Sequence, residues 1–428
     1  MAKGTKNTDI LYRSEKFELF WNRRPVCAPT AEELALLTIT SENLRTVWNE
    51  AWRARMDAYE NFFKPIYEKI GTAKKLQDEA LVKGLYGELR DAFKQHGVSL
   101  YDQINALTPR RKADPAFASI PRNWQEETLD CLDASFKSFF ALRKNGDADA
   151  KQPFARETPG FFCKIPGRYG FSFDGENITI SFAGLGQRIV CQVPDHQRER
   201  FGNSLRLKKF EIYRDERDLS KPGSFWISVA YEIPKPPEKP VTPDNTVYLA
   251  LGASYLGMVC PKGEFYFRLP RPDFHWKPLV DQVQERLKNV TKGSRKWKKR
   301  ISARWRMFDI LGKQQKQGQY ELIQEELLSQ GVHFVITDLV VRSKTGALAD
   351  ASKPERGGAP TGANWSAQNT GWIANLVAKL AEKAKEHGGI VVKREPSQLS
   401  PQERKMHPGE RKIIIARRMR EAFLADQQ

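Results

Sequence analysis

Apolar residues recur every three or four positions between residues 30 and 143, which is the spacing of one face of a helix. Thr30 and Glu33 precede the first stripe with the spacing of a capping box at a helix N-terminus. The first stripe contains Leu44, Val47, Trp48, Ala51, Trp52 and Met56. Further helices are predicted over residues 74–96 and 121–143. We therefore expect residues 30–150 to form a helical block.

The pattern changes to a period of two in residues 153–234, where short alternating runs are separated by Gly, Asp and Asn. Runs such as RYGFSFDGENITISF and SFWISVAYEI are typical of antiparallel strands joined by turns. Residues 10–26 alternate in the same way and predict one or two further strands. We expect residues 151–235 to form a small antiparallel sheet or barrel.

A proline-rich segment separates this region from the remainder of the chain. IPKPPEKPVTPDN, at residues 233–245, contains five prolines and predicts an extended linker, which we place at residues 236–245. Residues 246–428 then alternate between apolar strand-like runs, such as VYLALGA and FVITDLVV, and longer helical stretches. This alternation predicts an α/β or α+β domain, so the expected fold class is multi-domain α+β.

The charge of the chain favours a polyanionic partner. The 428 residues include 70 Lys and Arg against 52 Asp and Glu, a formal net charge of +18. Clustered Lys and Arg neutralise phosphates, so nucleic acid is the leading candidate. No apolar run approaches the ~18 residues of a membrane-spanning helix, and the N-terminal residues lack the apolar core of a signal peptide. We therefore expect a cytoplasmic protein without a membrane partner.

The densest cluster of positive charge is KGSRKWKKR, at residues 292–300. On a helix, this stretch and the residues after it give one packed face and one cationic face that almost lacks acids. A solvated basic helix is one explanation, and phosphate binding is the explanation we favour. Lys208 and Lys209 alternate with apolar residues and predict a second basic surface on a sheet. The candidate nucleic-acid-binding residues are Lys292, Arg295, Lys296, Trp297, Lys298, Lys299, Arg300, Arg304, Lys208 and Lys209.

Candidate catalytic residues are scarce. A two-metal phosphodiesterase needs carboxylates at the ends of neighbouring strands, and the C-terminal strands offer only Asp338. The five cysteines form no C-x-x-C pair, no histidines stand in a metal-binding pair, and no phosphate-binding glycine loop is present. The sequence therefore predicts no resident cofactor and no zinc.

Four stretches resemble the TnpB proteins of transposons and the related type V CRISPR effectors. They are WQEETLDCLDASFKSFFALRKNG with the following PFA, KGSRKWKKR, VITDL, and NTGWIANLVAKLAEKAKEHGGIVVKREPSQLSPQ. The resemblance, with its parts in the same order, covers nearly the whole chain. The resemblance implies a helical recognition domain, an OB-like β barrel (the wedge) that residues 1–29 help to complete, and an RNase H-like (RuvC) domain over residues 246–428. It also implies a guide RNA and target double-stranded DNA as partners, with base pairing reading the sequence.

The chain departs from that family at its catalytic positions. The first motif has Ala250 where the family has Asp, and the second has Thr337 where the family has Glu, with Asp338 as a possible remnant. The third acid is replaced near Lys412 or Ile413, and the zinc ribbon is missing. These losses predict a degenerate RuvC-like domain without bound Mg²⁺.

The expected function is RNA-guided DNA binding without cleavage in a bacterial cytoplasm, at the nucleoid when bound to its target. Such binding would block transcription or serve antiviral defence. Two alternatives stay open: an active Mg²⁺-dependent guided nuclease carrying an engineered Ala250, and a general binder of structured RNA. A CRISPR guide and a transposon-derived guide are also both open.

Overall fold

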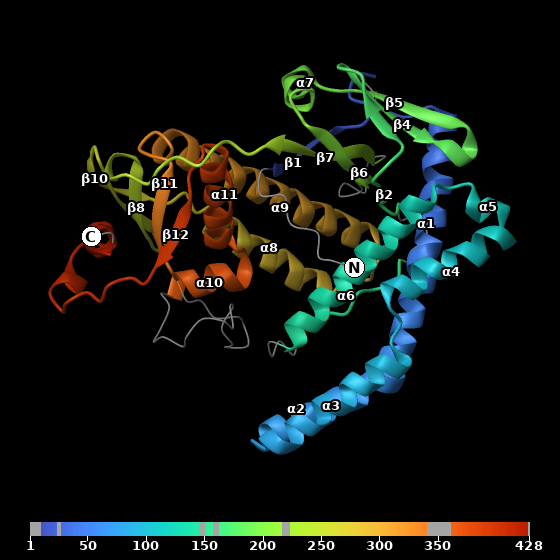
Figure 1. Ribbon diagram of the computed structural model, residues 1–428, viewed down its shortest axis with the longest axis horizontal. Coiled ribbons are helices and arrows are strands. Elements are labelled where there is room, and N and C mark those ends of the chain that lie inside the picture. The colour runs from blue at the N-terminus through green and yellow to red at the C-terminus, as the bar shows by residue number, and fades with distance from the viewer. Residues whose placement is uncertain are drawn as a thin grey trace.

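The computed structural model describes residues 10–23, 27–144, 150–156, 162–215, 223–339 and 361–426 (Figure 1). Its N-terminal part is helical, as predicted. The helices are α1 (Ala31–Ala58), η1 (Tyr59–Phe63), α2 (Lys64–Lys75), α3 (Glu79–His96), α4 (Leu100–Ala113), α5 (Pro115–Ala118) and α6 (Arg122–Lys144). The predicted capping box is confirmed, because Thr30 accepts from the Glu33 amide and Glu33 accepts from the Thr30 amide. Helices α4 and α5 were not predicted from the sequence.

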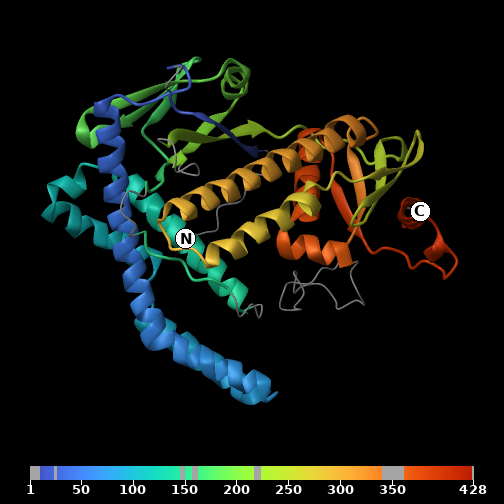
Figure 2. The ribbon, with the colours of Figure 1, turned by 180° about the vertical axis from the view of Figure 1, so that it is seen from behind.

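Helices α2 and α3 pair into an arm that projects away from the rest of the molecule (Figures 1 and 2). The arm has its own apolar core, which includes Phe63, Ile66, Ile70, Leu85 and Leu89. A second core joins α1, α4 and α6 and includes Val47, Trp48, Leu107, Leu129 and Leu132. The helical block thus consists of a packed base and an extended arm.

The β-rich region forms two sheets. The strands are β1 (Ile10–Glu18), β2 (Ile165–Gly167), β3 (Phe171–Phe173), β4 (Asn177–Phe182), β5 (Gln187–Gln192), β6 (Arg206–Asp215) and β7 (Ser224–Pro234). One sheet has the order β1-β7-β6-β2 and the other β3-β4-β5. β1 pairs along all of its length with β7, so the N-terminal strand joins this region. A short helix, α7 (Asp195–Gly202), lies between β5 and β6.

The prediction of a closed β barrel is wrong for the described strands. The described strands form two separate sheets that share one apolar core, and they do not close into a barrel. The core continues into the helical block through Trp124 of α6, which is fully buried and packs edge-on against Phe182 and Phe210. Its indole N–H donates to the carbonyl of Tyr169 at 3.1 Å. Trp124 of α6 therefore contacts both sheets of this core.

The C-terminal part is built on a five-stranded sheet of order β10-β9-β8-β11-β12. Its strands are β8 (Thr246–Leu251), β9 (Tyr255–Cys260), β10 (Gly263–Arg268), β11 (His333–Thr337) and β12 (Val391–Arg394). β8, β9 and β10 are antiparallel, whereas β11 is parallel to both β8 and β12. The predicted strands near residues 246, 334 and 390 are therefore confirmed.

Helices cover both faces of this sheet. α12 (Pro408–Ala425) packs on the face that carries Tyr248, Ala250 and Val335. α11 (Trp372–Glu386) and η4 (Leu322–Leu327) pack on the opposite face, against Leu249 and Ile336. Shorter helices of this part are η3 (Pro243–Asn245), α10 (Thr361–Asn369) and η5 (Glu403–Lys405), and η2 (Ala183–Leu185) belongs to the β-rich region. Burial on both faces explains why these strands are almost continuously apolar.

A helical hairpin extends from the five-stranded sheet toward α1 and α6 (Figures 1 and 2). It consists of α8 (Pro272–Lys288) and α9 (Arg295–Glu321), and the stretch KGSRKWKKR lies at its tip. At the other end of the hairpin, Arg13 of β1 forms ion pairs with Glu382 and Glu386 of α11, which tie the β-rich region to the C-terminal part. No helix of the described residues is both long and apolar enough to cross a membrane.

Candidate nucleic-acid interface

The three positions that the resemblance assigns to catalytic acids meet at one residue, Leu251, at the end of β8. The Leu251 amide donates to the Thr337 hydroxyl at 2.9 Å, which joins the ends of β8 and β11. The Leu251 carbonyl accepts a hydrogen bond from the Lys412 ammonium at 2.8 Å. Ala250, the preceding residue, is fully buried against Ile415 and Ala416 of α12. The fold thus brings the three positions together with no carboxylate among them.

Two glycines allow Lys412 to lie this close to the sheet. A Cβ at Gly252 would lie 2.6 Å from Lys412 Cε, and one at Gly257 would lie 2.3 Å from the Lys412 carbonyl carbon. Burial, with a smaller contribution from the neighbouring Arg411, lowers the pKa of Lys412 to about 8. The absence of side chains at Gly252 and Gly257 therefore leaves room for the Lys412 amine beside the Leu251 carbonyl.

Asp338, the possible remnant, stands one residue beyond β11. Its amide donates to the carbonyl of Arg394 at 2.6 Å, so its backbone continues the pairing of β11 with β12, and the residue is half-buried. Asp273, which the sequence analysis did not single out, is fully buried and accepts from Arg271 and Thr370. Within the described ranges, no three His, Cys, Asp or Glu side chains are grouped to hold a metal ion.

The tip of the α8–α9 hairpin carries most of the predicted nucleic-acid-binding residues. Ser294 caps α9, and its hydroxyl accepts from the Trp297 amide at 3.2 Å. Lys292, Arg295, Lys296, Lys298 and Lys299 are exposed, whereas Trp297, Arg300 and Arg304 are half-buried. Arg300 donates to the carbonyl of Arg286, and Arg304 stacks on Trp305 and Phe308. None of these eight residues forms an ion pair with a described carboxylate.

This placement is electrostatically unfavourable for the isolated helix. The N-terminal end of a helix carries a partial positive charge, and cations there typically cost about 0.3–1 kcal/mol each. The first turn of α9 contains basic residues and no acid. A phosphate at this end would bind both the side chains and the positive end of the helix. In the alternative explanation, a solvated helix face, nothing offsets the electrostatic cost of cations at the helix N-terminus.

The second predicted basic surface is partly neutralised. Lys208 pairs with Glu232 at 3.0 Å, and Lys209 pairs with Glu127 of α6 at 3.6 Å. The two lysines thus link strands and helix as well as facing solvent, and their binding of nucleic acid stays a prediction.

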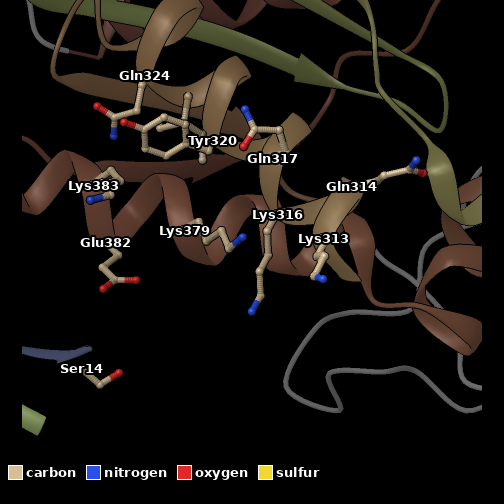
Figure 3. Close-up of a pocket in the computed structure, with 11 residues that line it drawn as sticks. Ser14, Lys313, Gln314, Lys316, Gln317, Tyr320, Gln324, Lys379, Glu382 and Lys383 are labelled. Atoms are coloured by element: carbon tan, nitrogen blue, oxygen red, sulfur yellow. The ribbon is translucent and has the colours of Figure 1, made fainter. Parts of the chain in front are cut away.

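A groove that the sequence analysis missed lies between α9, α11 and β1 (Figure 3). It has a volume of about 900 Å³ and is lined by Ser14, Lys313, Gln314, Lys316, Gln317, Tyr320, Ile323, Gln324, Lys379, Glu382 and Lys383. The signal in the sequence was the spacing of residues 313, 316, 317, 320 and 324, which places them on one polar face of a helix. The lysines that α11 contributes are too distant in sequence for any spacing to connect them.

No protein-family model and no curated protein matches this chain. A solved structure described as "Cryo-EM structure of the Cas12f1-sgRNA-target DNA complex" is similar, with 11% sequence identity and a TM-score of 0.47. The similarity covers 91% of this chain and 82% of that chain.

Replacing Arg295, Lys296, Lys298 and Lys299 with Glu should weaken RNA binding and lower its salt dependence. Each phosphate interaction that the substitutions remove should reduce the slope of log K against log salt by about 0.7 for a single strand. A charge-preserving variant, with each Lys exchanged for Arg and Arg295 for Lys, is the matched control and should bind like the parent. Unchanged affinity and slope in the Glu variant would remove the role assigned to the tip, and filter binding over a salt series makes the measurement.

Lys412 should make stability depend on pH. Its folded pKa of about 8 lies below the ordinary 10.5, so between these values the unfolded chain binds more protons at this position. The free energy of unfolding should therefore rise with pH through this window, by an amount on the order of 1–3 kcal/mol relative to Lys412→Met. Urea denaturation followed by tryptophan fluorescence at about pH 7 and about pH 10 compares the two proteins. Parallel pH profiles would show that Lys412 titrates normally.

Proposed function

We propose that this protein binds DNA under the guidance of an RNA and does not cut it. The observation that carries the proposal is the Lys412 ammonium bonded to the Leu251 carbonyl, at the junction of the three positions where the family has its acids. Mg²⁺ requires oxygen ligands, and a fixed ammonium at the same edge would repel it. Binding can persist in such a domain while metal-dependent cleavage cannot.

The sheet supports the assignment of this part of the chain to an RNase H-like fold. Three antiparallel strands followed by two parallel strands, in the order β10-β9-β8-β11-β12, is the arrangement expected of that fold. In it, catalytic acids stand at the ends of the first and fourth strands and on the last helix. Those positions correspond here to Ala250, Thr337 and either Lys412 or Ile413. Thr337 and Lys412 both bond to Leu251, the residue after Ala250.

The binding half of the proposal rests on the hairpin tip. Its unpaired cations crowd the first turn of a capped helix that extends toward the helical block, so a phosphate backbone between the two parts would be held from the C-terminal side (Figure 2). Guide RNA paired with target DNA presents such a backbone in A-form geometry, and the base pairs rather than the protein select the sequence. The partners are therefore a guide RNA and target double-stranded DNA in a bacterial cytoplasm, and occupancy of the target is what silences it.

Purification of the protein with its native flanking DNA tests the proposal of guided binding. Sequencing the RNA that accompanies it should give one dominant small RNA with a constant structured part and a targeting end. The protein with that RNA should bind matching double-stranded DNA and not a scrambled duplex. A mixture of unrelated cellular RNAs would replace the proposal with the general binder of structured RNA.

A guided nuclease carrying an altered first motif is the second candidate, because Asp338 still stands at the end of β11 beside Thr337. Ala250→Asp restores that motif, and we expect no Mg²⁺-dependent cleavage of guide-matched DNA from it. The new carboxylate would stand one residue from the carbonyl that Lys412 already binds, so it would meet an ammonium in place of a metal. Cleavage by this single variant would overturn the non-cutting proposal. Retained guided DNA binding shows that the variant is folded.

A further inference from the structure

The groove between α9, α11 and β1 has an excess of positive charge, because its lining holds four lysines and one glutamate. Lys316 of α9 and Lys379 of α11 line it from opposite walls, and neither forms an ion pair with a described carboxylate (Figure 3). Burial lowers the pKa of Lys379, and the nearby charge of Lys316 lowers it further. Two like charges thus converge on one space, which an anion placed between them would stabilise.

The other charged groups of the groove already have partners. Lys313 pairs with Asp309 at 2.9 Å, and Lys383 pairs with Glu386 at 2.9 Å. Glu382, the carboxylate among the lining residues, accepts from Arg13 at 2.9 Å. The unbalanced charge therefore resides on Lys316 and Lys379.

An aromatic ring stands beside this charge. Tyr320 is 56% exposed although it lines the groove, and Gln317 and Gln324 flank it on the same helix face (Figure 3). Proteins bind unpaired nucleotides with an exposed aromatic ring next to cations. A base stacks on the ring, and the phosphate backbone contacts the positively charged side chains. Bases within a duplex are stacked on each other and present no free face, so a continuous duplex would leave Tyr320 unused.

The groove continues the basic surface of the tip along α9. Lys299, Arg306, Lys313 and Tyr320 follow at seven-residue intervals, close to two helical turns each, and so lie near one face. From Lys299 to Tyr320 this face is about 30 Å long at 1.5 Å per residue. A strand bound at the tip can therefore reach the groove without leaving the helix.

We propose that this groove binds an unpaired segment of nucleic acid, with phosphates on Lys316 and Lys379 and a base stacked on Tyr320. The inference rests on the proposed function, since it names a site for a single strand of the guide RNA or of the DNA that the guide displaces. Both sources share the same backbone and base chemistry.

The test measures binding of short labelled oligothymidylate and oligouridylate to the full chain carrying its own RNA. Lys316→Ala with Lys379→Ala should reduce the slope of log K against log salt by about 1.4, which is two phosphate contacts. Tyr320→Ala should weaken binding by at least about fivefold, and Tyr320→Phe should not. Lys385→Ala, an exposed lysine of α11 outside the groove, is the matched control and should leave both quantities unchanged.

An abasic strand separates stacking from charge. Tyr320→Ala should not change binding of the abasic strand, whereas Lys316→Ala with Lys379→Ala should weaken it. Preference for oligouridylate would assign the groove to the RNA, and preference for oligothymidylate to the displaced DNA strand. Either result supports the site.

Two outcomes would overturn the inference. One is equal loss of single-strand and duplex binding in the lysine variant, and the other is unchanged oligonucleotide binding in all groove variants. If the groove variants bind normally while the protein still carries a discrete RNA and binds its matching DNA, the groove inference fails and the proposed function stands. If no discrete RNA is found but the groove variants lose oligonucleotide binding, the reverse holds.

Discussion

The C-terminal part depends on one residue, Leu251, whose backbone is bonded on both sides at the end of β8. Its amide donates to the Thr337 hydroxyl and its carbonyl accepts from the Lys412 ammonium, so β8, β11 and α12 are all joined at this residue. Three carboxylates at this junction would repel one another unless a cation lay between them. An alanine, a threonine and a lysine remove that repulsion, and the lysine supplies a cation that is covalently part of the chain.

The positive charge of the chain is organised differently from the charge at this junction. Lys412 is buried and bonded, whereas the cations of the hairpin tip are exposed, lack ion-pair partners among the described residues, and stand at the helix end where they are least favourable. The two lysines of the groove without ion-pair partners among the described residues, Lys316 and Lys379, lie on α9 and α11. Elsewhere in the described residues, basic side chains are neutralised by carboxylates, as Lys208 is by Glu232. Residues 295–304, the first part of α9, contain no carboxylate, and that end of the helix is where we propose that a polyanion binds.

The sequence predicted the elements well where a strong period or cap was present. The Thr30 capping box and the apolar strands β8 and β11 needed only local information. The arrangement of the β-rich region as two sheets could not be predicted. Trp124 of α6 packs against Phe182 and Phe210, and contacts between residues so far apart in the chain leave no local signal. Helices α4 and α5 were missed because their apolar positions are few, and a proline, Pro109, stands inside α4.

The candidate site likewise contains residues that local sequence could predict and residues that only the fold brings together. Residues 292–300 could be predicted as a basic surface because their charges are contiguous, and Ala250, Thr337 and Lys412 or Ile413 were assigned through a resemblance of short motifs. The groove escaped because its two unpaired lysines are 63 positions apart, Lys316 on α9 and Lys379 on α11, and only the packed helices bring them together. The position of Lys412 was identified, but its bond to Leu251 required Gly252 and Gly257, whose missing side chains carry no signal by themselves. A substituted acid could have left an empty site, and these glycines show how the backbone instead admits an amine that closes it. Gly252 and Gly257 therefore matter for the proposed non-cutting role, because a side chain at either position would displace Lys412 from the Leu251 carbonyl.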